Sequence, residues 1–187
     1  MGPSMSHGEN TRTISGHRDV VFAVVYSPDG ATIATGSEDK TVQLWRANDG
    51  TPQRTLNHES AVRAVAYTPD GKTLAVACDN GKVMLWRVSD GVRLRTLSGH
   101  ENSVWAVAYS PDGSLLATGS NDRTVRLWQA SDGAHLRTLR GHENYLEAVA
   151  FSLDGKSIAT GSADTTLRLW QASDGAHRLT LRGHEKS

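Results

Sequence analysis

Histidine, serine and aspartate recur at fixed spacing along the chain, and these are the residue types of a hydrolytic triad. Each set has a histidine, a serine 20 residues later, an aspartate two residues after that and a tryptophan six residues further on. A catalytic serine would be framed once, by a sharp turn such as G-x-S-x-G, and no such frame surrounds these serines. The repetition therefore favours a structural role. The complete sets are His17, Ser37, Asp39, Trp45; His100, Ser120, Asp122, Trp128; and His142, Ser162, Asp164, Trp170.

The remaining set departs from this pattern, because it consists of His58, Cys78, Asn80 and Trp86. A thiol is a weak hydrogen-bond donor and an amide carries no charge, so we expect this repeat to have the weakest polar network. Cys78 is the single cysteine, which excludes an intramolecular disulfide, and we expect it to be buried and unreactive. The histidines lack the close spacing of zinc ligands, so we expect neither a metal site nor a cofactor.

These residues lie within a longer repeat. The histidines at positions 17, 58, 100, 142 and 184 are 41 or 42 residues apart, a period typical of repeat architectures. In the third unit, Val104–Tyr109 is an apolar, β-branched run that predicts a strand buried on both faces. Residues 115–118, 124–128 and 136–139 predict three more strands, and the Ser-Pro-Asp-Gly sequence at 110–113 predicts a turn. Four short antiparallel strands per unit are typical of a propeller blade.

The order Gly-His, Ser-Pro-Asp-Gly, Gly-Ser-x-Asp and Leu-Trp resembles the WD40 repeat family, in particular its bacterial-style repeats, over about residues 14–184. The aspartate that usually follows the signature tryptophan is missing from every repeat. The resemblance implies an all-β propeller with four blades per chain and no catalytic residues. It also implies a buried relay in each blade, in which the tryptophan N–H donates to the serine, the serine to the histidine, and the histidine to the aspartate or to a backbone turn.

The resemblance further implies that a protein or peptide partner docks where the loops between blades open. Aromatic and arginine side chains dominate binding hot spots, and both occur at the matching positions. An equally weighted alternative is that these side chains only pack on neighbouring blades. The positions are Phe22, Glu38, Arg63, Asp79, Trp105, Asn121, Tyr145 and Glu147.

We expect residues 1–10 to be a tag or disordered N-terminus, and residues 11–184 to form the blades, at about 16–57, 58–98, 99–140 and 141–183. Residues 11–14 resemble one extra outer strand. Closed propellers have about four to eight blades, and four wide blades would leave two bare apolar faces. We therefore predict an eight-bladed ring in a homodimer, in which blade 4 of each chain meets blade 1 of the other.

Composition excludes other classes of function. The net charge is zero, unlike that of a nucleic-acid binder. No apolar run approaches the ~20 residues that span a membrane, and no signal peptide is visible, so we expect a cytoplasmic protein. We interpret the chain as a non-catalytic scaffold for protein–protein interaction that self-assembles through blades 1 and 4. One alternative is an engineered or fragmentary half-propeller with no activity beyond homo-oligomerisation, and a less favoured one is a Ser-His-Asp hydrolase.

Overall fold

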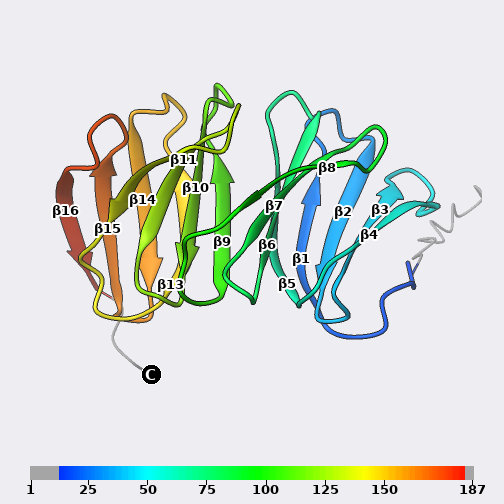
Figure 1. The fold of residues 1–187 in the computed structure, drawn as a ribbon, viewed down its shortest axis with the longest axis horizontal. Coiled ribbons are helices and arrows are strands. Elements are labelled where there is room, and N and C mark those ends of the chain that lie inside the picture. The colour runs from blue at the N-terminus through cyan, green and yellow to red at the C-terminus, as the bar shows by residue number, and fades with distance from the viewer. Residues whose placement is uncertain (1–12, 184–187) are drawn as a thin grey trace, which may run out of the picture.

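The computed structural model describes residues 13–183 as four antiparallel sheets of four strands each, standing side by side (Figure 1). Within each sheet the strands lie in chain order, so each sheet is one propeller blade. The predicted all-β fold and the number of blades are confirmed. The strands are β1 (Val21–Tyr26), β2 (Thr32–Ser37), β3 (Thr41–Arg46) and β4 (Pro52–Asn57) in blade 1; β5 (Val62–Tyr67), β6 (Thr73–Cys78), β7 (Val83–Arg87) and β8 (Arg93–Leu97) in blade 2; β9 (Val104–Tyr109), β10 (Leu115–Ser120), β11 (Val125–Gln129) and β12 (His135–Leu139) in blade 3; and β13 (Leu146–Phe151), β14 (Ser157–Ser162), β15 (Thr166–Gln171) and β16 (His177–Arg182) in blade 4.

The predicted turn joins the first two strands of each blade. In blade 3, the N–H of Gly113 donates to the carbonyl of Ser110 over 2.8 Å, and Gly113 has a φ of +73°, which glycine adopts without strain. The carboxylate of Asp112 accepts hydrogen bonds from the Ser110 hydroxyl and from the Ser114 N–H, at 2.6 and 3.0 Å. The turn is therefore closed by its own side chains, as its sequence predicts.

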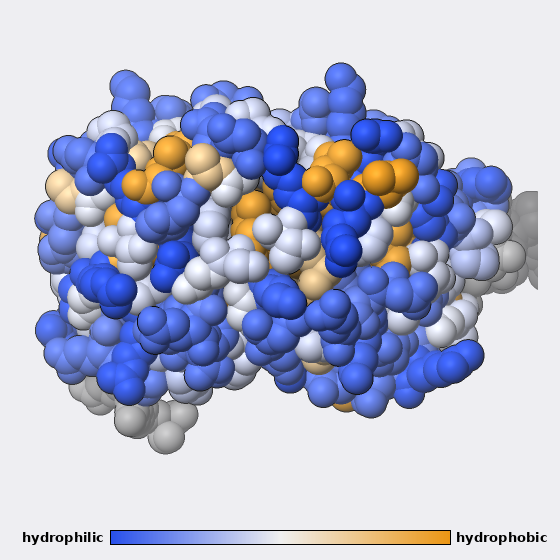
Figure 2. Space-filling model, in the orientation of Figure 1, coloured by the Kyte–Doolittle hydropathy of each residue, from blue (hydrophilic) through white to orange (hydrophobic). Residues whose placement is uncertain are grey.

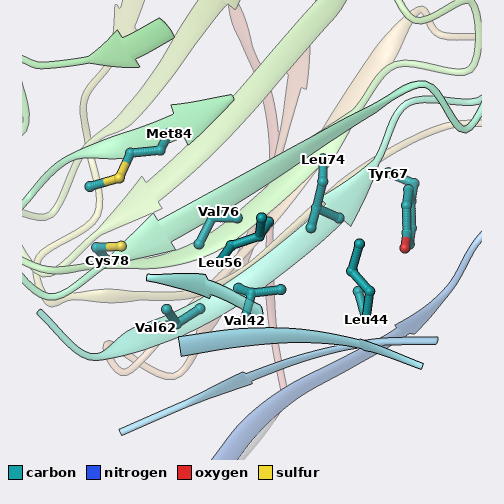
Figure 3. Close-up of a cluster of buried hydrophobic side chains, with 10 residues drawn as sticks. Val42, Leu44, Leu56, Val62, Tyr67, Leu74, Val76, Cys78 and Met84 are labelled. Carbon is teal, nitrogen blue, oxygen red and sulfur yellow. The ribbon is translucent and has the colours of Figure 1, made fainter. Parts of the chain in front are cut away.

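The hydrophobic core lies between the blades, in three clusters that each join two neighbouring sheets. Between blades 1 and 2, Val42 and Leu44 pack against Val62, Leu74 and other side chains of the next sheet (Figure 3). Full burial of such a side chain contributes about 1.5–3 kcal/mol. The fold is therefore stabilised mainly by blade-to-blade contacts, and a blade at the end of the arc has only one neighbour.

The two end blades show the consequence of a missing neighbour. In blade 3 Val104 is fully buried, whereas its equivalent in blade 1, Val21, is 48% exposed, and Val24 on the same strand is 68% exposed. The prediction that the first strand of a unit is buried on both faces is therefore wrong for blade 1, because no sheet covers its outer side. Figure 2 shows one mostly hydrophilic face of the molecule, with hydrophobic side chains gathered in separate patches.

The extra strand predicted at 11–14 is only partly covered by the structure. Thr13 and Ile14 are not in a strand, and residues 1–12, which include the predicted tag, lie outside the described residues. Within residues 13–183, no helix is long and apolar enough to cross a membrane.

Candidate functional site

A hydrogen-bond relay runs through blades 1, 3 and 4. In blade 3 the indole Nε1–H of Trp128 donates to the hydroxyl of Thr118 over 2.9 Å. That hydroxyl lies 2.7 Å from Nε2 of His100, and Nδ1 of His100 lies 2.7 Å from the carboxylate of Asp122. The equivalent relays are Trp45–Thr35–His17–Asp39 and Trp170–Thr160–His142–Asp164.

The relay differs from the expected one, because a threonine stands where the serine was predicted. Ser120 lies two residues further along β10, about 6.6 Å away, at the loop end of the strand. Its hydroxyl donates to the carbonyl of Asn102 and accepts from the N–H of Asp122, both at 3.0 Å. Ser37 and Ser162 make the same two contacts, so the serines fasten the loop and do not link tryptophan to histidine.

The aspartate makes Nδ1 of the relay histidine a hydrogen-bond donor. Burial of Asp122 disfavours its ionised form, but hydrogen bonds from His100, the Thr124 hydroxyl and the N–H of Glu101 outweigh burial and hold its pKa well below the usual range. The same balance lowers the pKa of Asp39 and Asp164. A carboxylate only accepts, so Nδ1 of His100 donates to it, and Nε2 on the other side of the ring faces the hydroxyl of Thr118.

Blade 2 has a shortened relay. Val76, a fully buried residue, takes the place of the threonine, and Asn80 takes the place of the aspartate. The indole N–H of Trp86 donates directly to Nε2 of His58 over 3.1 Å. The two ring centroids are 5.3 Å apart, compared with 6.4 Å in each of the other blades. Blade 2 therefore lacks two of the four relay members, the threonine and the aspartate. The sequence predicts the loss of the aspartate and indicates Cys78 as the second departure, whereas the second missing member is the threonine.

Cys78 is fully buried, and burial raises the pKa of its thiol to about 12. The thiol is the nucleophile only when ionised, so a pKa this high leaves Cys78 unreactive near neutral pH. Among residues 13–183, no group of three or more His, Cys, Asp and Glu side chains could hold a metal ion.

The structure brings together part of the predicted partner face. Phe22, Arg63, Trp105 and Glu147, one from each blade, line a hollow of about 240 Å³. The Arg63 guanidinium makes two hydrogen bonds to Asp79, at 2.7 and 2.5 Å, and lies 4.1 Å from the centre of the Phe22 ring. Because these contacts fix Arg63, the hollow has a preformed wall.

The other predicted face residues lie around this hollow. Glu38 forms an ion pair with Arg63 at 3.2 Å, and the rings of Trp105 and Tyr145 are 5.2 Å apart. The side-chain oxygen of Asn121 is buried without a hydrogen-bond partner among the described residues. Several of the predicted face residues thus contact side chains of neighbouring blades and line or border the hollow at the same time.

Comparison with known proteins agrees with this geometry. The family model described as the second β-propeller of the echinoderm microtubule-associated protein matches residues 21–184. The chain belongs to the WD40 β-propeller family. A solved structure titled "Structure of U3-55K" superposes with a TM-score of 0.87 at 24% identity, over 93% of this chain and 55% of that one, which shows a shared fold.

Curated relatives match over about one WD40 repeat. Protein Mut11 of Chlamydomonas reinhardtii is 49% identical over 45 residues, 24% of this chain and 12% of that protein. Protein Notchless of Drosophila melanogaster is 47% identical over 45 residues, 24% of this chain and 9% of that protein. The chain therefore spans only a small part of the length of these relatives.

In a WD40 blade, a relay of this kind ties the loop that precedes the blade to the blade itself. The His100 ring comes from the loop, and Trp128 comes from β11. Linking them through Thr118 satisfies buried polar groups that would otherwise each cost about 1–3 kcal/mol. The relay residues are buried and repeated in three blades, which is an arrangement suited to stability.

The shortened relay of blade 2 predicts that the free energy of unfolding of this WD40 chain depends on pH. Burial lowers the pKa of His58 to about 4, from an ordinary value of 6.5. The unfolded state then binds a proton at a higher pH than the folded state, so this contribution to stability is present above pH 6.5 and is lost as the pH falls toward 4. Between pH 7 and about 4.5 we expect a loss of about 2 kcal/mol in the free energy of unfolding, measured by urea denaturation.

A His58→Gln variant provides the control, because glutamine retains an acceptor for the Trp86 indole and does not titrate. We expect its stability to change less over the same pH range. An equal loss in this variant would show that His58 is not the group responsible.

Proposed function

We propose that this WD40 chain is a non-catalytic scaffold that completes its ring with a second copy, through blades 1 and 4, and presents the loop face to a protein or peptide. One observation carries the proposal. The two ends of the arc expose the two halves of an interface that the chain forms three times internally.

Blade 4 exposes the first half. In blade 3, Leu127 and Leu139 are 1% and 4% exposed, because blade 4 covers them. Leu181, the blade 4 equivalent of Leu139, is 47% exposed, and Leu167 beside it on β15 is 36% exposed. Positions whose side chains form the core between two blades inside the chain are therefore open to solvent on blade 4.

Blade 1 exposes the second half. In blade 2, Tyr67 packs against blade 1 and is only 8% exposed, whereas its blade 1 equivalent, Tyr26, is 60% exposed. Val24 and Val21 lie on the same strand and are also exposed. Contiguous apolar patches of this kind on soluble proteins usually mark an interface. A second copy offers a sheet of matching sequence to each of the two patches.

The solution mass tests this proposal. Light scattering over a range of protein concentrations should show a species of twice 20.2 kDa. Substituting Val24→Asp places a charge on the bare face and should yield a single chain of 20.2 kDa, because an unpaired buried charge opposes association. Val24 is 68% exposed in the single chain, so the blade itself should fold.

Leu153→Asp is the matched control, because Leu153 is 96% exposed on a turn and belongs to neither bare face. It should leave the mass unchanged. A wild-type chain that remains at 20.2 kDa at every concentration would contradict ring closure by a second copy.

A second proposed activity is binding of a peptide at the hollow formed by Phe22, Arg63, Trp105 and Glu147. It distinguishes a scaffold from a half-propeller whose only activity is homo-oligomerisation. A displayed library of random peptides should yield binders to the wild-type protein, and Trp105→Ala should weaken their binding at least tenfold while the melting temperature stays within a few degrees. A library that yields no such binder would favour the half-propeller. We propose a cytoplasmic location, consistent with the single, unreactive Cys78.

The hydrolase alternative is disfavoured by the contacts of the serines. The hydroxyls of Ser37, Ser120 and Ser162 donate to backbone carbonyls and make no hydrogen bond to a histidine among the described residues. A nucleophilic serine requires a general base within hydrogen-bond reach. We therefore expect a fluorophosphonate probe to label none of these serines.

A further inference from the structure

The segment that precedes blade 1 follows the path of an outer strand leaving a preceding blade. A Cβ placed on Gly50 would lie 2.8 Å from Cγ1 of Ile14. A Cβ on the equivalent Gly133 would lie 2.6 Å from Leu97, the last residue of β8, and one on Gly175 would lie 2.7 Å from Leu139, the last residue of β12. Ile14 thus occupies on blade 1 the place that the end of the previous outer strand occupies on blades 3 and 4.

This position creates a conflict in a ring of two copies. The blade that would precede blade 1 is blade 4 of the second copy, and its last outer-strand leucine is Leu181. Leu181 of that copy would need the place beside Gly50 that Ile14 of the first chain already fills. The two segments therefore compete for one site, and also for the outer edge of β15, which pairs with β16 in the single chain.

A second observation separates the two competitors. An arginine in the middle of the outer strand reaches the turn of the next blade in all three internal interfaces. The hydrogen bonds run from Arg54 to the carbonyl of Asp90 over 2.6 Å, from Arg95 to that of Ser131 over 3.3 Å and from Arg137 to that of Ser173 over 2.8 Å. At the matching position β16 has Leu179, which is 46% exposed. The N-terminal segment reads Thr11-Arg12-Thr13-Ile14, with an arginine two residues before the isoleucine, as Arg137 precedes Leu139.

We propose that residues 11–14 supply the outer strand of blade 4 of a second copy, in place of β16, when the ring closes. This inference rests on the proposed self-association and specifies which strand completes it. The exchange would leave Ile14 where it already lies and would place Arg12 where the internal interfaces have their arginine. By the register of β11 with β12, Thr13 would pair with Arg168, as Thr138 pairs with Arg126.

Paired cysteines test this register directly, in a Cys78→Ala background. The Cα atoms of directly paired residues in antiparallel strands are about 4.5–5.5 Å apart, a separation that a disulfide bridges. Thr13→Cys with Arg168→Cys should therefore form an interchain disulfide, seen as a dimer on a non-reducing gel. Thr180→Cys with Arg168→Cys joins residues paired in the single chain, so it should form an intrachain disulfide that fixes β16 and lowers the fraction of dimer in solution.

Deletion of residues 1–14 provides a second measurement, which does not depend on disulfide geometry. It should shift the protein to the mass of one shortened chain, which is below 20.2 kDa, whereas the melting temperature should show that the blades remain folded. The inference is overturned if the deleted chain remains a dimer, or if the chain with β16 fixed dimerises as the wild type does and the Thr13–Arg168 pair fails to cross-link. A wild-type chain that never dimerises would instead refute the proposed ring, and this inference with it.

Discussion

Replacing Thr118 with valine should lower the free energy of unfolding by about 1–3 kcal/mol, and the melting temperature by about 4–8 °C at the middle of that range. The substitution keeps the β-branched shape of the side chain and removes the hydroxyl between Trp128 and His100. The Trp128 side chain and His100 are buried, so their ring nitrogens would lose a partner where water does not replace it. Urea denaturation followed by tryptophan fluorescence measures the change.

Blade 2 explains why the cost should not reach the sum of two unsatisfied groups. It has Val76 at this position, and its indole donates directly to His58 after the rings approach to 5.3 Å. In the Thr118→Val variant the rings of His100 and Trp128 can approach each other in the same way. The indole N–H would then donate directly to His100, which recovers one hydrogen bond.

Two variants bracket this result. Thr96→Val makes the same chemical change at an exposed position of β8 and should alter stability by less than about 0.5 kcal/mol. Thr118→Ser keeps a hydroxyl and should lose less than Thr118→Val. If Thr118→Val were as stable as Thr96→Val, the threonine would not be a relay member.

The relay also shows where the sequence was informative and where it was not. The repeat period and the Asp-Gly turns predicted the blades, because turn residues and apolar runs encode local structure directly. The WD40 resemblance implied a serine in the relay, and this was wrong: the serine recurs in a fixed motif, whereas Thr35, Thr118 and Thr160 resemble ordinary strand residues of high β-propensity. Blade 2 contained a usable signal, since Val76 and Asn80 replace the threonine and the aspartate together.

The partner face was only partly predictable for a different reason. The WD40 resemblance implied that Arg63 lies on this face. It did not imply the hydrogen bonds with Asp79 that fix the guanidinium, because they depend on the approach of two strands and on two side-chain conformations. In the same way, the sequence suggested two bare faces without showing that Ile14 already fills a site on one of them.

Gly36→Ala should destabilise the chain by about 1–3 kcal/mol through overpacking, whereas Gly161→Ala should change the stability of the single chain by less than about 1 kcal/mol. The two glycines are equivalent in blades 1 and 4, and neither has the positive φ that makes a side chain unfavourable. A Cβ on Gly36 would lie 2.5 Å from Cγ1 of Val62, which is fully buried and β-branched and so has little freedom to move. A Cβ on Gly161 would meet only Ala148, at 3.6 Å.

The same pair of variants reports on self-association, because Val62 packs on Gly36 across an internal interface and Val21 of a second copy would pack on Gly161 in the proposed ring. Gly161→Ala should therefore weaken the dimer at least tenfold, in light scattering at decreasing concentration, while a dilute sample unfolds at the wild-type denaturant midpoint. If the dimer were unaffected, the Gly161 face would be uncovered in it, and the two copies would associate through another surface. The added methyl group strains the internal interface at Gly36 but meets open space at Gly161 in the single chain. The same glycine-to-alanine change at these two equivalent positions therefore separates the folding of one chain from the closure of the ring by two chains.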